Sequence, residues 1–171
     1  MTMNHRIYLD YCATTPVHPD VRAAMLIALE DTYGNPSSMH WAGRQAAERV
    51  MQARQQVAAG VGCAPEEVYF TSGATEADNL ALSGIMHRYA PDQAHLITTT
   101  IEHHAILHPA EKLAHQGYAV TFVPVDQNGW VDPEEIQRAI RKETRLVSVM
   151  LVNNEVGTIQ PVANIARLAH E

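Results

Sequence analysis

The chain has 171 residues, of which 46% are hydrophobic and 18% charged, and its formal net charge is −7. This composition is that of a globular protein able to bury a core in a single domain. The negative charge argues against a nucleic-acid partner, the two cysteines are too few for a disulfide framework, and the lack of a long apolar run or leader argues against a membrane partner. We therefore expect a cytoplasmic protein.

The first third of the chain predicts an arm followed by two helices. Residues 7–9 predict a short strand or an extended segment, and residues 10–16 predict a turn-rich arm that ends at proline. An amphipathic helix is expected over 20–31, a loop of turn-forming residues over 33–38, and a long helix over about 42–59. Residues three or four positions apart predict one buried stripe on the long helix: Ala46, Val50, Ala53, Val57 and Val61.

The middle of the chain predicts a strand, a turn of small residues and a helix. Residues 67–70 favour a short strand, and a helical pattern begins at about Ala77. Between them lies Thr71-Ser72-Gly73-Ala74-Thr75. Such a turn presents backbone N–H groups at the positive end of a helix, where phosphate binds well. The alternative is a plain N-cap made by Ser or Thr. The turn is neither a Walker loop nor a dinucleotide fingerprint, because no Lys follows Gly73 and the three-glycine spacing is absent.

Strands and helices alternate through the rest of the chain. The segment Asp132-Pro133-Glu134-Glu135 predicts the start of a helix, because it is typical of a capping box with proline at the first helical position. We expect strands over 95–99, 118–125 and 146–152, and helices over about 77–89, 104–116, 133–142 and from 162 onward. The last of these strands is an almost unbroken apolar run, which is typical of a strand buried on both faces. This alternation predicts an α/β fold with helices around a mostly parallel sheet.

Three predicted turns follow strands or precede helices at the same edge of such a sheet: 71–75, 102–104 and 153–155. Ligands of open α/β sheets bind at the carboxyl ends of the strands, so these turns are able to share one site. His103 has the chemistry of a general acid or base, or of a flat ring that stacks on a flat cofactor. Asn154 is able to donate a hydrogen bond to a phenolate or carboxylate. The alternatives are a capping or surface histidine and a turn-forming asparagine.

The remaining histidines and cysteines predict no metal site. No group of them has the spacing of metal ligands. Four histidines scattered on helices and strand ends are expected to be solvated: His87, His95, His108 and His115.

Five segments of the chain resemble blocks of the cysteine desulfurases, in the order found in that family. They are residues 8–16, 33–38, 70–79, 102–103 and 152–155. Cysteine desulfurases belong to the class V aminotransferases and have the fold-type I architecture of enzymes dependent on pyridoxal 5'-phosphate (PLP). The arm and the Asn-Asn-Glu segment resemble the NifS/IscS-like branch. The resemblance implies removal of sulfur from L-cysteine to give L-alanine and an enzyme persulfide, transfer of that sulfur to an acceptor or iron–sulfur scaffold protein, and a homodimer at full length.

The resemblance also assigns roles to individual residues. Ala74 and Thr75 would hold the phosphate of PLP, in agreement with the anion-binding turn. His103 would stack on the pyridine ring and move protons at the substrate. Asn154 would lie near the phenolic oxygen of the cofactor and the substrate carboxylate, and residues 13–15 would border the mouth of the active site.

The chain departs from this family in its length, since family members are more than twice as long. The resemblance divides it into an arm, 1–15, and an incomplete PLP-binding large domain, 16–171. No residue matches the Schiff-base lysine, the aspartate that pairs with the pyridine nitrogen, the arginine that binds the substrate carboxylate or the persulfide-forming cysteine. Lys112 and Lys142 lie on helix-like segments, and Cys12 is not at the nucleophile position.

We therefore expect the 171-residue chain alone to be inactive. Its strand at 146–152 would form a poorly covered, aggregation-prone edge. Two alternatives stay open: a selenocysteine lyase, which shares these blocks, and a non-catalytic remnant of a truncated or split gene.

Overall fold

The computed structural model describes residues 6–171. The chain forms two compact units, the first ending at Phe70 and the second covering Thr71–Glu171. They are described separately below. The expected division into an arm, 1–15, and a large domain, 16–171, stays a prediction.

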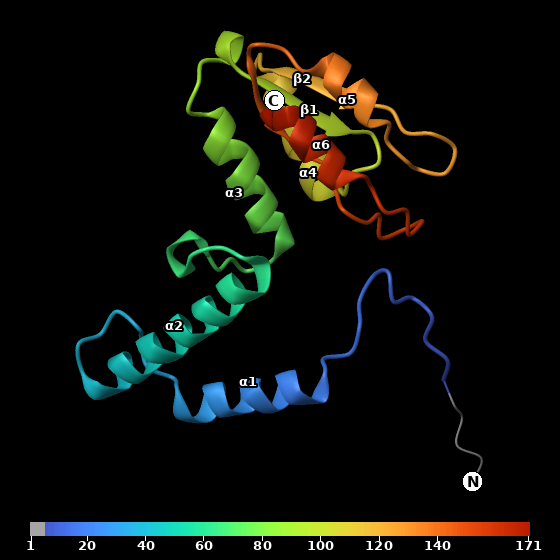
Figure 1. The fold of residues 1–171 in the computed structure, drawn as a ribbon. Helices are drawn as coiled ribbons and strands as arrows, with labels where there is room; N and C mark the ends of the chain where they lie inside the picture. The colour runs from blue at the N-terminus through green and yellow to red at the C-terminus, as the bar shows by residue number, and fades with distance from the viewer. Residues whose placement is uncertain (1–5) are drawn as a thin grey trace. The chain divides into compact units, whose positions relative to one another are not determined.

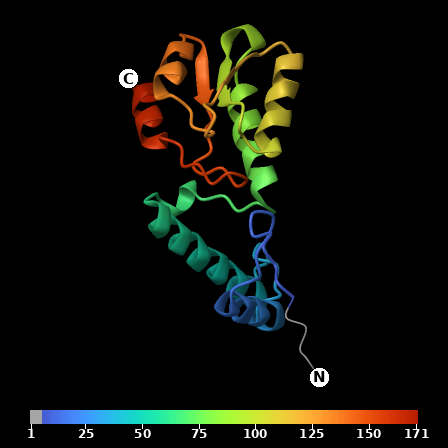
Figure 2. The same ribbon diagram turned by 90° about the vertical axis from the view of Figure 1, so that its right-hand side faces the viewer.

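The second unit is a three-layer α/β/α sandwich (Figures 1 and 2). Its parallel sheet has the strand order β2-β1-β3, formed by β1 (His95–Thr99), β2 (Ala119–Val123) and β3 (Thr144–Val147). Figure 2 shows helices on both faces of the sheet. One face is covered by α3 (Ala74–Met86) and α4 (His104–His115), the other by α5 (Pro133–Ala139) and α6 (Val162–His170), and a 3₁₀ turn, η2 (Pro91–Gln93), precedes β1. The predicted α/β fold with a parallel sheet is confirmed.

Alternate residues of the central strand supply the two cores of this unit. Leu96 packs with buried residues of α3 and α4, while Ile97 packs against α5 and α6. All five residues of β1 are buried, because β1 has a strand on each side and helices on both faces. The first core consists of Leu82, Met86, Ala94, Leu96, Ile106, Ala110, Leu113 and Tyr118, and the second of Ile97, Val123, Val131, Ile136 and Ile165.

Strand β3 is shorter than predicted and lies at the edge of the sheet. It ends at Val147, and its residues are half-buried or exposed rather than buried on both faces. The Ser148 N–H donates to the carbonyl of Ile97 at 2.9 Å, after which the chain leaves the sheet. A strand with one neighbour keeps its other edge open, which explains the partial burial. The expected aggregation of this edge stays a prediction.

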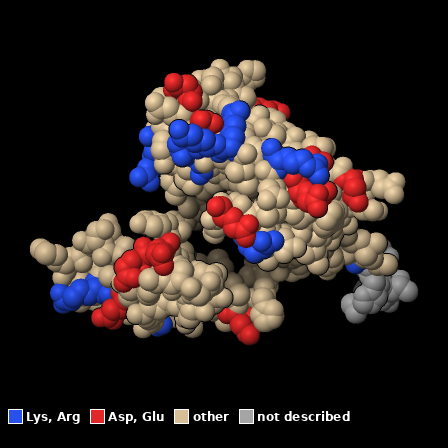
Figure 3. All heavy atoms as spheres, turned by 45° about the horizontal axis from the view of Figure 1, so that its top comes forward, with Lys and Arg blue, Asp and Glu red and all other residues tan. Residues whose placement is uncertain are grey.

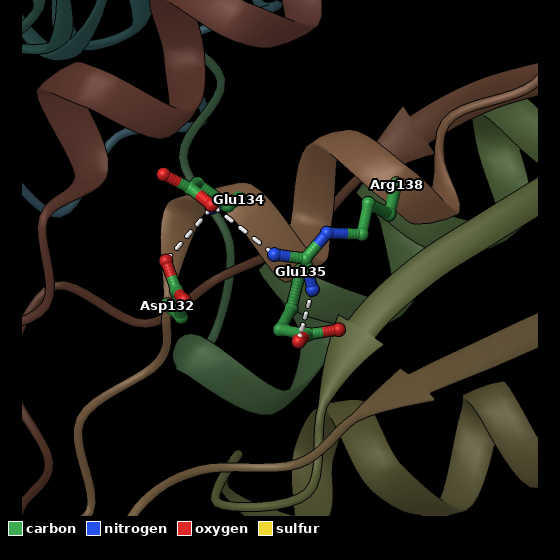
Figure 4. A network of polar contacts seen from close by, with 4 residues as sticks. All are labelled: Asp132, Glu134, Glu135 and Arg138. Atoms are coloured by element: carbon green, nitrogen blue, oxygen red, sulfur yellow. Dashed lines mark hydrogen bonds and ion pairs between the residues drawn. The ribbon is translucent and has the colours of Figure 1, made fainter.

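The start of α5 follows the predicted capping pattern. Pro133 occupies the first helical turn, and Asp132 Oδ1 accepts from the Glu134 N–H at 2.9 Å. The Arg138 guanidinium forms ion pairs with the carboxylates of both Glu134, at 3.1 Å, and Glu135 (Figure 4). Because these side chains are exposed, the ion pairs add little to stability, and the cap and proline define the helix start.

The first unit contains α1 (Pro19–Asp31), α2 (Trp41–Val61) and a 3₁₀ turn, η1 (Pro65–Glu67). The loop before α2 folds closely onto the helix. A Cβ atom at Gly34 would lie 2.2 Å from the Ala42 carbonyl oxygen, and one at Gly43 would lie 2.2 Å from that of Ser38. Glycine is therefore required at both positions, since backbone atoms cannot move aside.

Residues 7–9, expected as a short strand or an extended segment, lie outside the helices and strands. Two other sequence predictions for this unit are wrong. Residues 67–70 form no strand, because this segment pairs with no strand within the described residues. The stripe predicted on α2 is not buried: Ala46 is buried, but Val50, Val57 and Val61 are 38%, 42% and 71% exposed. Helix α1 likewise has no buried residue among those described. An apolar stripe marks a face able to pack, and a second surface must cover it before it is buried.

Charge is distributed without a dominant sign on the face shown in Figure 3, where Lys and Arg lie among Asp and Glu. Within residues 6–171, no helix combines the length and the apolar character that a membrane crossing requires.

Two loops of the second unit are held together by Gln160, which is 3% exposed. Its Nε2 donates to the Gly129 carbonyl at 2.6 Å, and its Oε1 accepts from the Val131 N–H at 2.9 Å. We expect Gln160→Ala to lower the free energy of unfolding by about 2 kcal/mol, because it leaves two buried backbone groups without partners. Chemical denaturation measures this loss. Exposed Gln127 on the same loop gives the control Gln127→Ala, and equal stability of the two variants would contradict the role of Gln160.

Candidate functional site

A buried carboxyl group joins the carboxyl ends of β1 and β3. Glu102, 7% exposed, follows β1 by three residues. Its Oε1 accepts from the Thr99 hydroxyl at 3.0 Å and from the Met150 N–H at 2.8 Å. One carboxyl oxygen therefore holds the turn after β1 against the segment that continues β3.

This carboxyl group lies in a pocket with a second acid and a histidine. Burial raises the pKa of Glu102 above its ordinary value, hydrogen bonds from Met150 and Thr99 act in the opposite direction, and the charge of Asp78 adds to the rise. Asp78, Glu102 and His103 line the same pocket, together with Ile106, Ser148, Val149 and Met150. A carboxyl group with a perturbed pKa, in a pocket with other polar side chains, is typical of functional sites.

His103 is the N-cap of α4, and its ring is exposed. Its Nδ1 accepts from the Ala105 N–H at 3.0 Å. With Nδ1 acting as the acceptor, the neutral ring carries its proton on Nε2. The structure thus bears out the capping alternative for His103 and leaves Nε2 available for a ligand.

The turn at 71–75 leads directly into α3, which begins at Ala74 rather than at Ala77. Among the described residues, no side chain caps this helix, and the N–H groups of Ala74 and Thr75 have no hydrogen-bond partner. The donors of Ser72 are occupied, because Glu76 Oε2 accepts from its N–H at 2.7 Å and from its hydroxyl at 2.6 Å. Hydrogen bonds from the Ser72 side chain and then its backbone lower the pKa of Glu76. The unpartnered N–H groups of Ala74 and Thr75 are therefore the groups that the family resemblance assigns to the phosphate of PLP.

The turn after β3 contacts the turn after β1 through Asn153. Its Nδ2 donates to the Ile101 carbonyl at 3.0 Å, and its Oδ1 accepts from the N–H groups of Glu155 and Val156, each at 2.9 Å. Asn154 is exposed, and its Nδ2 donates to Glu155 Oε1 at 3.0 Å.

The structure brings the sequence-predicted residues to one rim of the sheet without placing all of them in one pocket. Thr75 lines a pocket with Asn79 and His104, while His103 lines the neighbouring pocket with Asp78. Ala74 lies beside Thr75 in the first turn of α3, and Asn154 follows the residue that contacts the β1–α4 turn. Sequence reasoning did not single out Glu102, Asp78 or Asn153. An acid directly before His103, at the end of an apolar strand, is the signal that could have indicated Glu102.

Comparison with known proteins decides the family. The profile described as aminotransferase class-V matches residues 7–171. The chain belongs to the class-V aminotransferase family. Its similarity to the NifS/IscS-like cysteine desulfurases, which the five sequence blocks indicate, is confirmed by the relatives.

Three relatives illustrate this similarity. The protein named putative cysteine desulfurase IscS 1 of Bacillus subtilis is 48% identical over 166 residues, covering 97% of this chain and 44% of the relative. The solved structure of a NifS-like protein has a TM-score of 0.92 and 41% identity, covering 96% of this chain and 45% of that one. The structure of SspA in complex with cysteine has a TM-score of 0.91 and 36% identity, covering 95% and 47% of the two chains.

This class-V aminotransferase chain spans less than half the length of the curated relatives it matches, at 42% to 44%. The relatives cover both compact units and all three rim segments of the second unit.

Proposed function

We propose that this chain supplies the phosphate-cradling part of a PLP-dependent cysteine desulfurase. The observation that carries the proposal is the proximity of three rim segments in the second unit. Hydrogen bonds join the Glu102–His103 turn to the segment that contains Asn153 and Asn154, and the uncapped start of α3 shares pockets with residues 102–104. These segments match the family blocks in order. The solved relative SspA was determined with cysteine, the substrate class proposed here.

The donor set at the start of α3 fits the phosphate of PLP. The N–H groups of Ala74 and Thr75 are unpartnered among the described residues, and the Thr75 hydroxyl lies in the same turn. A Cβ atom added at Gly73 would meet nothing within 4 Å, so the backbone here is open to an approaching oxygen. A dianion at this point is favoured by the positive end of the 13-residue helix α3.

The other rim residues supply positioning and proton transfer. His103 presents a ring for stacking and a proton on Nε2, which suits it to move a proton at the substrate. Asn154 would donate a hydrogen bond to the cofactor's phenolic oxygen or to the substrate carboxylate, and this bond would replace the one to Glu155. Glu102 holds the His103 turn against the segment leading to Asn154. PLP, when bound, supplies the electron sink that stabilises negative charge at the substrate Cα.

The chemical steps after cofactor binding need a Schiff-base lysine and a persulfide-forming cysteine, and no residue of this sequence matches either one. Lys112 lies on α4 and Lys142 between α5 and β3, away from any family block. In the proposed whole enzyme, a cysteine thiolate accepts sulfur from L-cysteine, leaving L-alanine, and the persulfide passes its sulfur to an acceptor or iron–sulfur scaffold protein. The proposed assembly is a cytoplasmic homodimer.

The test is a chimera in which residues 1–171 replace the matched segment of the Bacillus subtilis relative. We expect the chimera to form alanine and sulfide from L-cysteine, and the 171-residue chain with added PLP to release no more sulfide than free PLP does. Activity of the chain alone would overturn the expected inactivity. A folded chimera without activity would support a non-catalytic remnant, and a strong preference for selenocysteine would support a selenocysteine lyase.

A further inference from the structure

Helix α4 carries two histidines one turn apart on the same face. The rings of His104 and His108 lie with their centroids 4.9 Å apart and their planes within 27° of parallel. Positions i and i+4 of a helix are neighbours on its surface, so the two side chains project together. Both histidines line one pocket, with Thr75 and Asn79 from α3 and with Lys112 one turn further along α4.

The ring nitrogens of this pair are available to a ligand. Within the described residues, no hydrogen bond involves a ring nitrogen of His104 or His108, and both residues are exposed. Other histidines use their nitrogens within the fold. Both nitrogens of His95 bond to threonine hydroxyls, and Nδ1 of His103 accepts from a backbone N–H.

We infer that His104 and His108 form a two-histidine chelate for a borderline transition-metal ion, namely Zn²⁺, Ni²⁺ or Cu²⁺. Imidazole suits these ions, and two histidines at i and i+4 of a helix are a recurrent pair of metal ligands, a spacing that the sequence analysis did not single out. Because imidazole binds a metal in the plane of the ring, at least one of the two stacked, exposed rings rotates to form the chelate. Because the described residues contain no group of three or more His, Cys, Asp or Glu side chains able to hold a metal, water completes the coordination. Thr75 and Asn79 provide polar partners for that water in the same pocket.

Two consequences distinguish this site from an anion site in the same pocket. Binding by the second imidazole is intramolecular, which raises the affinity over a single histidine by roughly 10²-fold. The Lys112 ammonium opposes a cation by charge repulsion but would attract phosphate. A metal site therefore depends on both histidines and is weakened by Lys112, whereas an anion site depends on Lys112.

Calorimetric titration of the untagged 171-residue chain with Zn²⁺ and with Cu²⁺ at pH 7.5 tests the inference. We expect one site that dominates the titration, with Cu²⁺ bound more tightly than Zn²⁺. His104→Gln and His108→Gln should each weaken it by at least about 10-fold, since either change removes the chelate. Exposed His115 on the same helix gives the control His115→Gln, which should leave the affinity unchanged.

The variant Lys112→Gln distinguishes a metal site from an anion site in this pocket. For a metal chelate the Zn²⁺ affinity should stay equal or increase. A parallel titration with inorganic phosphate should show no binding that depends on Lys112. Metal affinity that is the same in the His104, His108 and His115 variants would overturn the inference, as would phosphate binding that is lost in Lys112→Gln. Far-UV circular dichroism confirms that each variant is folded before its titration is compared.

Discussion

Replacing His103 by Ala in the active chimera should lower the rate of alanine formation by between about 10² and 10⁴-fold. This is the range that a positioned general acid or base contributes, and the ring also stacks in the proposed site. The exposed Nε2 and the position of the ring beside Glu102 and Asp78 are the structural reasons for the expectation. Initial rates of alanine and sulfide formation, with cofactor content measured by absorbance, give the result.

The variant His103→Asn distinguishes chemistry from helix capping. Asn is a good N-cap, so it should preserve the start of α4, whereas Ala should cost about 1 kcal/mol of stability. We expect His103→Asn to unfold at nearly the same denaturant concentration as the parent and yet to be as inactive as His103→Ala. His115→Ala, on the same helix, should remain active. Substantial activity in His103→Asn would show that the residue serves only as a cap.

The second large effect is expected at His95, which spans the whole sheet at the amino end of β1. His95 is 1% exposed, Nδ1 pairs with Thr144 Oγ1 of β3 at 2.9 Å, and Nε2 pairs with Thr121 Oγ1 of β2 at 2.8 Å. Thr144 Oγ1 also accepts from the Arg141 N–H at 2.9 Å, so this hydroxyl links His95 to the loop before β3. His95→Ala should lower the free energy of unfolding by about 2–4 kcal/mol, because it leaves a cavity and removes the imidazole partner of two threonine hydroxyls.

The same residue should make stability depend on pH. Burial and then the charge of Arg141 lower the pKa of His95 to about 4, with Glu143 acting in the opposite direction. Because the folded pKa lies below the unfolded value near 6.5, the unfolded chain binds more protons between these values. The stabilisation is complete above about pH 6.5 and is lost as the pH falls toward 4.

Denaturation of the parent and of His95→Gln at pH 7 and pH 5 isolates this effect. Allowing for partial solvent screening, the parent should lose about 1–2 kcal/mol more than His95→Gln over this interval. Exposed His87 gives the control His87→Gln, which should follow the parent. Parallel pH curves for the parent and His95→Gln would contradict the lowered pKa.

Local sequence patterns were sufficient to predict most helices and strands of the second unit. The strand at His95–Thr99 was predicted with the bounds it has in the structure, and the Asp132-Pro133 start of α5 also appears as predicted. In each case the signal is local, since β-branched and apolar residues between turn formers favour a strand, and an acidic cap before proline starts a helix. The same signals put three turns at the carboxyl rim, and the structure connects two of them, those after β1 and β3, through Glu102 and Asn153.

The burial of other residues depended on packing against segments far away in the sequence, which a local pattern does not show. The segment 67–70 and the stripe on α2 have the pattern of buried elements, but only Val68 and Ala46 are buried, while Tyr69, Phe70 and the three valines of the stripe are exposed. His95 was expected to be solvated and is buried instead, because strands on both sides bring threonine hydroxyls to its two nitrogens. The pattern of a segment shows its capacity to pack, whereas burial requires a partner surface.

The sequence by itself determined the family, the alternation of strands and helices, and the identity of the rim residues, because these depend on local residue types and their order. Only the tertiary structure decided the chemical setting of those residues: the buried Glu102 carboxyl beside Asp78, the free N–H groups of Ala74 and Thr75, and the stacked pair His104 and His108. Burial, hydrogen-bond partners and shared pockets arise from residues far apart in sequence, so packing of the sheet and its helices had to bring them together.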